Sequence, residues 1–381
     1  MSTPAPRSGL GAWVAALALL GGCASAPQAS NGFADADGKL PSYQPRPGHE
    51  RPLIAVFGEN SGTELSDFTV PYGVLSESGA ADVVAVSTRP GPIATFTDMG
   101  KPGFRILGQA TLAAFDASHP DGADYVIVPA LRETPEALSW LALQAGKGAT
   151  LVSICNGGMV VADTGLMAGR RATAHWSTEA HRLEHHAAVR WVRNARYVAD
   201  GNWISTAGVS AALPASLALV EAIAGTERAQ ALARQLGSGG WSARHDSDAF
   251  HPQPGVNLLP LAQVAYLNRW LHAGDAYALP AADGADETTL ALTLDAYSST
   301  GRSRAYLTAA AGAPLRTRHG LFVLPDRVQG AADAPASALP AIDGLPPGQA
   351  LDRALDGIAA RYGRATARGV ALVFEYPDFQ E

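Results

Sequence analysis

A cysteine stands where the sequence changes from a strand pattern to a helix pattern. Residues 150–154 form a short, largely apolar run that leads to Cys155, and Asn156-Gly157-Gly158 follows as a tight turn before a helical apolar pattern. The partial positive charge and free N–H groups at a helix N-terminus favour a thiolate, so the position predicts a nucleophile with a thiol pKa below about 8.5. The alternative is a small buried hydrophobic residue, the usual state of cysteine. Local sequence leaves both interpretations open.

A histidine follows this cysteine after twenty positions. The strand-like run 171–174 ends at His175, whose imidazole is a candidate base or hydrogen-bond partner for Cys155. Active sites of open α/β sheets lie at the carboxyl ends of the strands. Because both residues follow predicted strands, we expect them to converge at that edge.

Three segments around these residues resemble the ThiJ/PfpI superfamily, the class I glutamine-amidotransferase-like proteins. They are SICNGG around Cys155, AxxGLMAGRRATAHW up to Trp176, and VADGNWISTAGVSA over residues 198–211. The resemblance covers roughly residues 52–236. Its nearest branch holds isonitrile hydratases and the amidase-like sensor domains of some bacterial transcription regulators. In that family the elbow cysteine is followed twenty positions later by a histidine, as here.

The resemblance adds a carboxylate to the expected site. In the family a carboxylate lies four residues before a proline in the segment after the first strand, and it reaches the cysteine. Asp67, four residues before Pro71, matches that position. The residues alone favour a helix-capping or exposed aspartate instead. Glu59 and Glu64 are the alternative carboxylates.

The resemblance also implies backbone donors for developing negative charge, near Asn156 and Leu131. Relatives usually carry Pro-Gly-Gly where this chain has Pro129-Ala130-Leu131, and alanine still offers a backbone N–H group. Isonitrile hydratases typically have a hydroxyl residue where Asn156 stands. Many relatives have an aspartate where this chain has Pro214.

The N-terminus has the pattern of a secreted lipoprotein. Arg7 precedes the apolar run 9–20, and Leu20-Gly-Gly-Cys23 resembles a bacterial lipobox, in which the cysteine is diacylated and becomes the mature N-terminus. We therefore expect a signal peptide over residues 1–22, a lipid on Cys23, and a location in the bacterial cell envelope facing the periplasm. The choice between the inner and the outer membrane is left open. The alternative to a lipoprotein is an ordinary signal peptide that happens to contain a cysteine.

The composition and net charge of the chain limit the kinds of partner it can bind. The chain has 381 residues, 47% of them hydrophobic, and a formal net charge of −7 with a pI near 5.8. Nucleic acid binding requires a basic face, and no helix-turn-helix with a basic recognition helix is visible. We expect a small-molecule substrate or ligand, a lipid anchor in the membrane and no nucleic acid. A homodimer is left open.

Alternating strand and helix patterns predict an α/β fold, a flavodoxin-like parallel sheet with helices on both faces. Residues 23–50, rich in Ala, Ser, Pro and Gly, suit a flexible tether. Residues 51–275 are expected to form the ThiJ/PfpI-like domain with an extension. Residues 276–381 form an accessory region of unknown fold, in which residues 290–294 look like a strand.

Metal and cofactor patterns are weak. His181-Arg-Leu-Glu184-His185 fits the H-x-x-E-H pattern of inverted zinc proteases, but no third ligand is evident and a catalytic zinc needs three. No glycine-rich phosphate loop is visible. We expect neither a metal nor a cofactor.

Two classes of function fit these residues. One is an enzyme whose Cys155 attacks an electrophilic carbon of a small amide, isonitrile or carbonyl compound, with Asp67 positioning or protonating the substrate. The other is a non-catalytic module that binds a small molecule or senses oxidants through its thiol.

Overall fold

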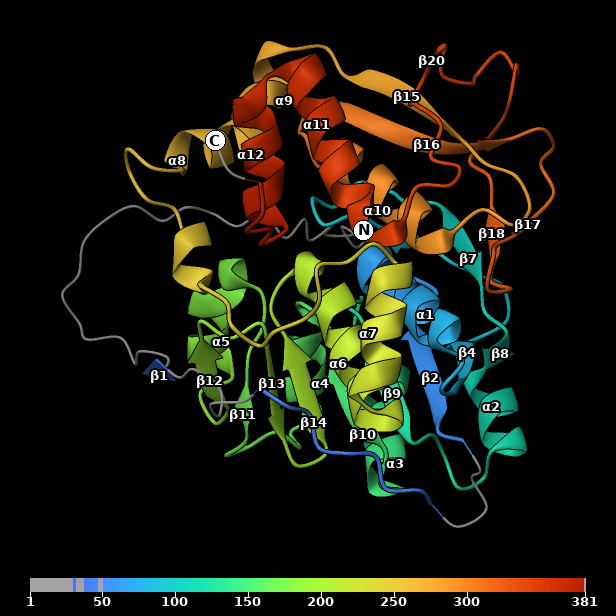
Figure 1. Ribbon diagram of the computed structural model, residues 1–381, viewed down its shortest axis with the longest axis vertical. Coiled ribbons are helices and arrows are strands. Elements are labelled where there is room, and N and C mark those ends of the chain that lie inside the picture. The colour runs from blue at the N-terminus through green and yellow to red at the C-terminus, as the bar shows by residue number, and fades with distance from the viewer. Residues whose placement is uncertain (1–29, 32–37, 47–50, 380–381) are drawn as a thin grey trace, which may run out of the picture.

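The computed structural model describes residues 30–31, 38–46 and 51–379 (Figure 1). The expected signal peptide and Cys23 lie outside the described residues, so both remain predictions. Among the described residues, none of the helices combines the length and apolarity needed to cross a bilayer.

A seven-stranded sheet lies at the centre of the molecule, in the order β13-β14-β10-β9-β2-β4-β8. Its strands are β13 (Tyr197–Asp200), β14 (Trp203–Thr206), β10 (Thr150–Ser153), β9 (Tyr125–Val128), β2 (Leu53–Gly58), β4 (Asp82–Ser87) and β8 (Ala110–Thr111). All neighbours are parallel except β13 and β14, which form an antiparallel hairpin. All six residues of β2 are buried, as a central parallel strand covered on both faces requires.

Helices cover both faces of this sheet, which confirms the predicted architecture. Successive side chains of β2 point to opposite faces, so Val56 joins one core and Phe57 the other. The first core is closed by α1 (Leu65–Ser78), α6 (Ala212–Ala224) and α7 (Thr226–Gln235). The second is closed by α2 (Leu112–Ser118), α3 (Pro135–Gly146) and α4 (Gly157–Asp163).

The C-terminal region builds a second, smaller sheet, which is parallel throughout and ordered β19-β16-β15-β20. Its elements are β15 (Asp275–Pro280), α10 (Glu287–Ser298), β16 (Ser303–Ala309), β19 (Arg327–Val328), β20 (Ser337–Ala338), α11 (Ala350–Tyr362) and α12 (Arg364–Val373). Figure 1 shows these orange and red elements stacked above the central sheet.

The strand expected at residues 290–294 is wrong, because this segment lies inside helix α10. The Asp286 side chain caps the helix by accepting a hydrogen bond from the Thr289 backbone N–H at 2.8 Å. Every residue of α10 is buried, including the polar residues Glu287 and Asp295, so the helix has no solvent-facing polar side. A helix of that kind lacks the 3.6-residue periodicity that distinguishes it from a strand.

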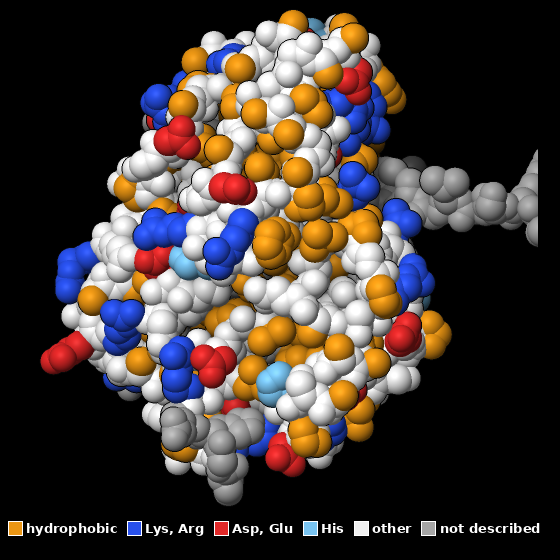
Figure 2. All heavy atoms as spheres, turned by 90° about the vertical axis from the view of Figure 1, so that its right-hand side faces the viewer, with side chains coloured by type: hydrophobic (Ala, Val, Ile, Leu, Met, Phe, Trp, Pro, Cys, Tyr) orange, Lys and Arg blue, Asp and Glu red, His pale blue; other side chains and the backbone are white. Residues whose placement is uncertain are grey.

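The C-terminal region and the central domain share one hydrophobic core. Leu290 and Leu294 of α10 pack in the same cluster as Phe68 of α1. His319 lies between Glu77 of α1 and Glu287 of α10, with its Nδ1 atom 2.5 Å from Glu287 Oε1. On the face shown in Figure 2, hydrophobic side chains gather where the two parts meet, and charges of both signs are interspersed.

An antiparallel sheet also joins the two parts, in the order β17-β18-β7-β5. The remaining elements are β1 (Ser30–Asn31), β3 (Thr63–Glu64), β5 (Pro92–Ile93), β6 (Thr95–Phe96), β7 (Arg105–Leu107), β11 (Arg171–Ala172), α5 (Glu179–His185), β12 (Arg190–Arg193), α8 (Leu258–Ala262), α9 (Asn268–Leu271), β17 (Leu315–Arg316) and β18 (Phe322–Leu324). A π-helical turn, Gln263–Leu267, connects α8 to α9.

Part of the segment expected to be a tether packs against the central domain. In residues 38–46, Leu40 is buried, and the Tyr43 N–H donates to the Ala222 carbonyl at 2.9 Å. Arg46 Nη1 donates to the Ala123 carbonyl at 2.7 Å. Composition suggested a tether, but the isolated apolar and basic side chains of this stretch supply specific contacts.

Candidate active site

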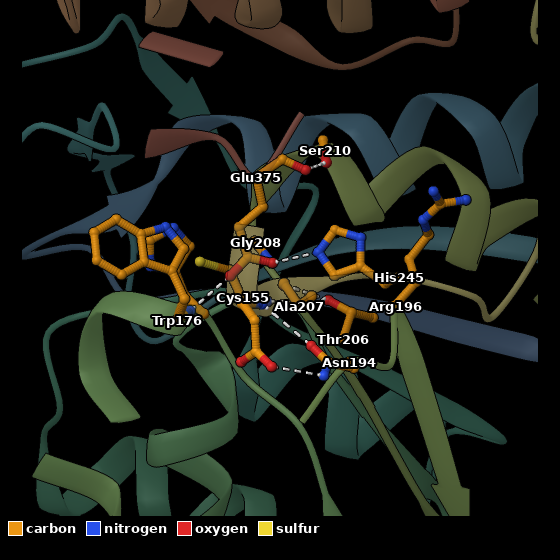
Figure 3. A network of polar contacts seen from close by, with 12 residues as sticks. Cys155, Trp176, Asn194, Arg196, Thr206, Ala207, Gly208, Ser210, His245 and Glu375 are labelled. Carbon is orange, nitrogen blue, oxygen red and sulfur yellow. Dashed lines mark hydrogen bonds and ion pairs between the residues drawn. The ribbon is translucent and has the colours of Figure 1, made fainter. Parts of the chain in front are cut away.

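Cys155 sits on a sharp turn between β10 and α4. Its φ angle is 54°, in the left-handed region that residues other than glycine rarely adopt. A Cβ atom on Gly157 would lie 2.0 Å from the Val128 carbonyl oxygen, so the turn packs backbone directly on backbone. The Cys155 N–H donates to Thr206 Oγ1 at 3.1 Å, which fixes the turn to the end of the neighbouring strand β14 (Figure 3). The strand-to-helix elbow predicted from the sequence is therefore present.

The thiol is closed off from solvent. Cys155 is only 1% exposed. Burial raises its pKa well above the ordinary value, and the charges of Asp67, Asp98, Glu64 and Glu375 raise it further. The expected lowering of the thiol pKa by the helix N-terminus is wrong for this conformation, because desolvation and surrounding carboxyl groups outweigh the helix dipole.

Asp67 lies close enough to Cys155 for its charge to raise the pKa of the thiol, and its catalytic role remains a prediction. It lies in the first turn of α1, is fully buried, and accepts a hydrogen bond from the Ala130 N–H through Oδ2 at 3.1 Å. Burial raises its pKa well above the ordinary value, and the nearby charge of Asp295 adds to the effect. Asp67 is not the cap of α1, since Glu64 accepts a hydrogen bond from the Asp67 N–H at 2.5 Å in that role.

Asp67 belongs to a cluster of carboxyl groups that the sequence does not reveal. Asp295 of α10 is fully buried beside it and accepts hydrogen bonds from Ser66 Oγ at 2.7 Å and from the Asp98 N–H at 3.0 Å. Burial raises the pKa of Glu64, and the charges of Asp295 and Asp67 raise it further. The raised pKa values favour the protonated form of these carboxyl groups, and the charges of Asp67 and Glu64 act on the nearby thiol.

Glu59, one of the alternative carboxylates for the site, makes hydrogen bonds that stabilise a loop. Its two carboxylate oxygens accept hydrogen bonds from the Ser61 N–H at 3.0 Å and from Thr134 Oγ1 at 3.2 Å. These bonds hold the loop after β2 against the start of α3.

His175 is buried near the site, but both ring nitrogens are engaged elsewhere. Nε2 lies 2.7 Å from the Val373 carbonyl oxygen, and Nδ1 lies 3.2 Å from the Ser177 backbone nitrogen, which donates to it. A carbonyl only accepts, so Nε2 carries the proton and the imidazole is neutral. Burial also lowers the pKa of His175. A catalytic role for His175 remains a prediction.

The expected oxyanion donors are partly engaged. The Ala130 N–H already donates to Asp67, and Leu131 lies in an isolated bridge to Thr63. The Asn156 side chain accepts a hydrogen bond from Thr178 Oγ1 at 2.9 Å. This bond connects the elbow to the turn after His175. The roles of Asn156 and Leu131 in binding an oxyanion remain predictions.

Glu375 is a component of the site that sequence reasoning missed. It follows α12, has a φ angle of 53°, and is fully buried. Its Oε1 accepts a hydrogen bond from the Trp176 N–H at 2.6 Å, and its Oε2 accepts from the Gly208 N–H at 3.0 Å and from His245 Nε2 at 2.9 Å. Figure 3 shows the side chain reaching toward Gly208 with Trp176 and His245 on either side.

Glu375 stays ionised despite its burial. Burial alone would raise its pKa, but the hydrogen bond from His245, the charge of His245 and the Gly208 N–H lower the pKa to about 2. The site therefore combines buried carboxyl groups whose pKa values are raised with one carboxylate, Glu375, whose pKa is lowered. Among the described residues, no group of three or more His, Cys, Asp or Glu side chains is arranged to hold a metal.

Part of the chain is similar to known proteins. The profile of the DJ-1/PfpI family matches residues 53–222. An isonitrile hydratase from Pseudomonas putida is 30% identical over 171 residues, which cover 45% of this chain and 72% of that protein. The HTH-type transcriptional regulator CdhR from Pseudomonas aeruginosa is 31% identical over 133 residues, 34% of this chain and 39% of the regulator. The crystal structure of DJ-1beta from Drosophila melanogaster is 23% identical with a TM-score of 0.43, and the match covers 50% of this chain and 99% of that one.

Proposed function

The chain belongs to the DJ-1/PfpI family, and from this premise we propose that it is a cysteine-dependent enzyme acting on a small amide, isonitrile or carbonyl compound. The observation that carries the proposal is the strained Cys155 at the strand-to-helix elbow, with the buried carboxyl of Asp67 beside it. Strained backbone at a buried nucleophile position is typical of a functional site.

The proposed reaction adds water to the substrate in two steps. The Cys155 sulfur forms a bond to the electrophilic carbon, while Asp67 gives its proton to the substrate nitrogen or oxygen and takes the thiol proton in return. For an amide, the C–N bond then breaks and the protonated amine leaves, which gives a thioester on Cys155. Water attacks the same carbon, the S–C bond breaks to release the acid, and the sulfur recovers a proton. The raised pKa of Asp67 supports this role, because only a protonated carboxyl can deliver the first proton.

The name of a relative suggests one substrate class, and a sequence difference at the site argues against it. One relative is named as an isonitrile hydratase. This chain has Asn156 where such enzymes typically have a hydroxyl residue, and an amide side chain donates a hydrogen bond without relaying a proton. We therefore rank amides and carbonyl compounds before isonitriles.

A second candidate is a non-catalytic module that binds a small molecule or senses oxidants. The observation that favours it is the 1% exposure of Cys155, together with its raised pKa, since a closed, neutral thiol is a poor nucleophile. In this interpretation the site responds to a ligand or an oxidant without turnover.

Location in the envelope is also part of the proposal. The lipobox pattern that ends at Cys23 supports a diacylated N-terminus facing the periplasm. Mass spectrometry of the mature protein from the membrane fraction is expected to show a diacylglyceryl cysteine. A mature chain that starts elsewhere, or an unmodified Cys23, would rule out the lipid anchor.

The test of the enzyme proposal is a turnover screen. Native protein, Cys155→Ala and Asp82→Asn as an exposed control are assayed with small amides, isonitriles and dicarbonyl compounds. The enzyme proposal predicts turnover in native protein and in the control, and loss of turnover in a folded Cys155→Ala. Equal turnover in Cys155→Ala, or ligand binding without turnover in every class, contradicts it.

A further inference from the structure

Three hydrogen-bond donors near Cys155 form a receptor for a carboxylate. We propose that the Trp176 N–H, the Gly208 N–H and His245 bind the carboxylate group of the substrate, and that Glu375 occupies this position in the closed conformation. The inference rests on the proposed function and narrows its substrate to small carboxylic acids. Two of the donors lie within residues 53–222, which match the family, whereas Glu375 comes from the region beyond them.

The receptor satisfies both oxygens of a carboxylate. One oxygen of Glu375 accepts from Trp176 at 2.6 Å, and the other accepts from Gly208 at 3.0 Å and His245 at 2.9 Å. Two of these donors are backbone groups, whose positions are fixed by the fold. Hydrogen bonds to an ionised acceptor are stronger than those between neutral groups. A neutral amide cannot accept hydrogen bonds at the positions of both carboxylate oxygens, because its NH2 group only donates.

The receptor is built for close approach of its occupant. A Cβ atom on Gly208 would lie 2.7 Å from His175 Cδ2 and 3.0 Å from Glu375 Cγ, so this approach requires glycine. The His245 side chain is 1% exposed and stacks on Phe250 with ring centroids 5.3 Å apart. A buried imidazole held in this way directs its Nε2 atom at the carboxylate.

The receptor also lies next to the reactive group. Thr206, at the end of β14, accepts a hydrogen bond from the Cys155 N–H, and Gly208 follows two residues later. The charge of Glu375 is close enough to raise the pKa of Cys155. A substrate held by its carboxylate would therefore present a neighbouring carbon to the sulfur.

The segment that carries Glu375 must withdraw before a substrate can enter. It is attached through the Val373 carbonyl to His175 at 2.7 Å and through the Phe374 carbonyl to the Ser210 N–H at 3.0 Å. Withdrawal leaves the three buried donors without an acceptor, which is costly. An incoming carboxylate restores all three bonds, and a neutral ligand does not.

The test removes the Glu375 side chain and asks whether a small carboxylic acid binds in its place. Glu375→Gly removes the side chain at a φ angle of 53°, where glycine is the favoured residue, and propionate replaces the atoms removed. The probes are propionate and its neutral isostere propionamide at equal ionic strength. The readouts are the melting temperature and the rate of Cys155 alkylation by iodoacetamide. Asp378→Gly is the matched control, because Asp378 is exposed on the same tail.

We expect Cys155 in Glu375→Gly to be alkylated about tenfold faster than in native protein, since charge-assisted contacts that hold the segment closed are lost. Propionate should slow alkylation and raise the melting temperature saturably, and propionamide should do neither. Should the variant be unfolded alone, refolding by propionate and not by propionamide supports the proposal equally.

Indistinguishable effects of propionate and propionamide on Glu375→Gly overturn the carboxylate receptor. An equal response of Asp378→Gly does the same, since it would show a non-specific salt effect. Neither readout requires turnover. A failed substrate screen with intact propionate binding therefore contradicts only the enzyme proposal, whereas turnover without propionate binding contradicts only this inference.

Discussion

The Nε2 atom of His175 lies 2.7 Å from the carbonyl oxygen of Val373, and this bond ties the histidine of the elbow motif to the end of the chain. The two residues are 198 positions apart. Because the bond uses the Nε2 proton and Nδ1 accepts from Ser177, the imidazole has neither nitrogen left to accept the Cys155 proton in this conformation.

Replacing His175 should therefore affect stability first. In His175→Ala the buried Val373 carbonyl loses its donor, and we expect the free energy of unfolding to fall by about 1–3 kcal/mol. Urea denaturation measures the change, with His272→Ala as the control because His272 is exposed. A variant of native stability that has lost turnover would instead identify His175 as a catalytic base.

The sequence was sufficient to predict the central sheet and the elbow. Parallel strands buried on both faces require continuous apolar runs, such as Leu53–Gly58, and these runs are visible without a structure. The turn at Cys155 is equally local, since it depends on adjacent glycines.

The rest of the site depends on contacts that no local pattern records. His245 and Glu375 are 130 residues apart, and Ser66 and Asp295 are 229 residues apart. Each of these side chains has an ordinary local sequence. Their roles arise only when the C-terminal region packs on the central domain, which also explains why a dipole argument for Cys155 failed. The helix dipole at Cys155 is opposed by burial of the thiol and by the carboxyl groups of Asp67, Asp98, Glu64 and Glu375, of which Glu375 comes from the C-terminal tail.

Asp67→Asn should shift the titration of Cys155 to lower pH. The charge that Asp67 would acquire at high pH raises the thiol pKa, and asparagine cannot acquire it. The fold should survive, because the asparagine oxygen still accepts from the Ala130 N–H. Turnover should fall, since the amide cannot exchange a proton, and Asp67→Ala should disturb both properties.

The measurement for Asp67 is the rate of Cys155 alkylation as a function of pH. Asp82→Asn is the control, because the Asp82 side chain is 65% exposed. Curves for Asp67→Asn that overlay the native curve would mean that Asp67 has no influence on the thiol.

Glu375 should contribute to stability in a defined range of pH. Its pKa of about 2 lies below the ordinary value of 4.5, so its contribution is present above about pH 4.5 and is lost as the pH falls toward 2. The difference corresponds to on the order of 3 kcal/mol. Glu375→Gln lacks the charge, so its unfolding free energy should be lower than native at pH 6 and approach the native value near pH 2. A constant difference between the two proteins over this range would contradict the role of the carboxylate.

Gly157→Ala should disrupt the elbow itself. Its Cβ atom would lie 2.0 Å from the Val128 carbonyl oxygen and 2.9 Å from the Pro129 carbonyl, and both contacts are with backbone that cannot rotate away. We expect a loss of at least about 3 kcal/mol of unfolding free energy, the upper range for overpacking. Gly146→Ala, at the end of α3, is the matched control. An added Cβ there meets nothing within 4 Å, so alanine should stabilise by about 0.5–1 kcal/mol. Urea denaturation of both variants decides the point: equal midpoints would show that the turn at Cys155 yields to an extra methyl group and is not held by backbone packing.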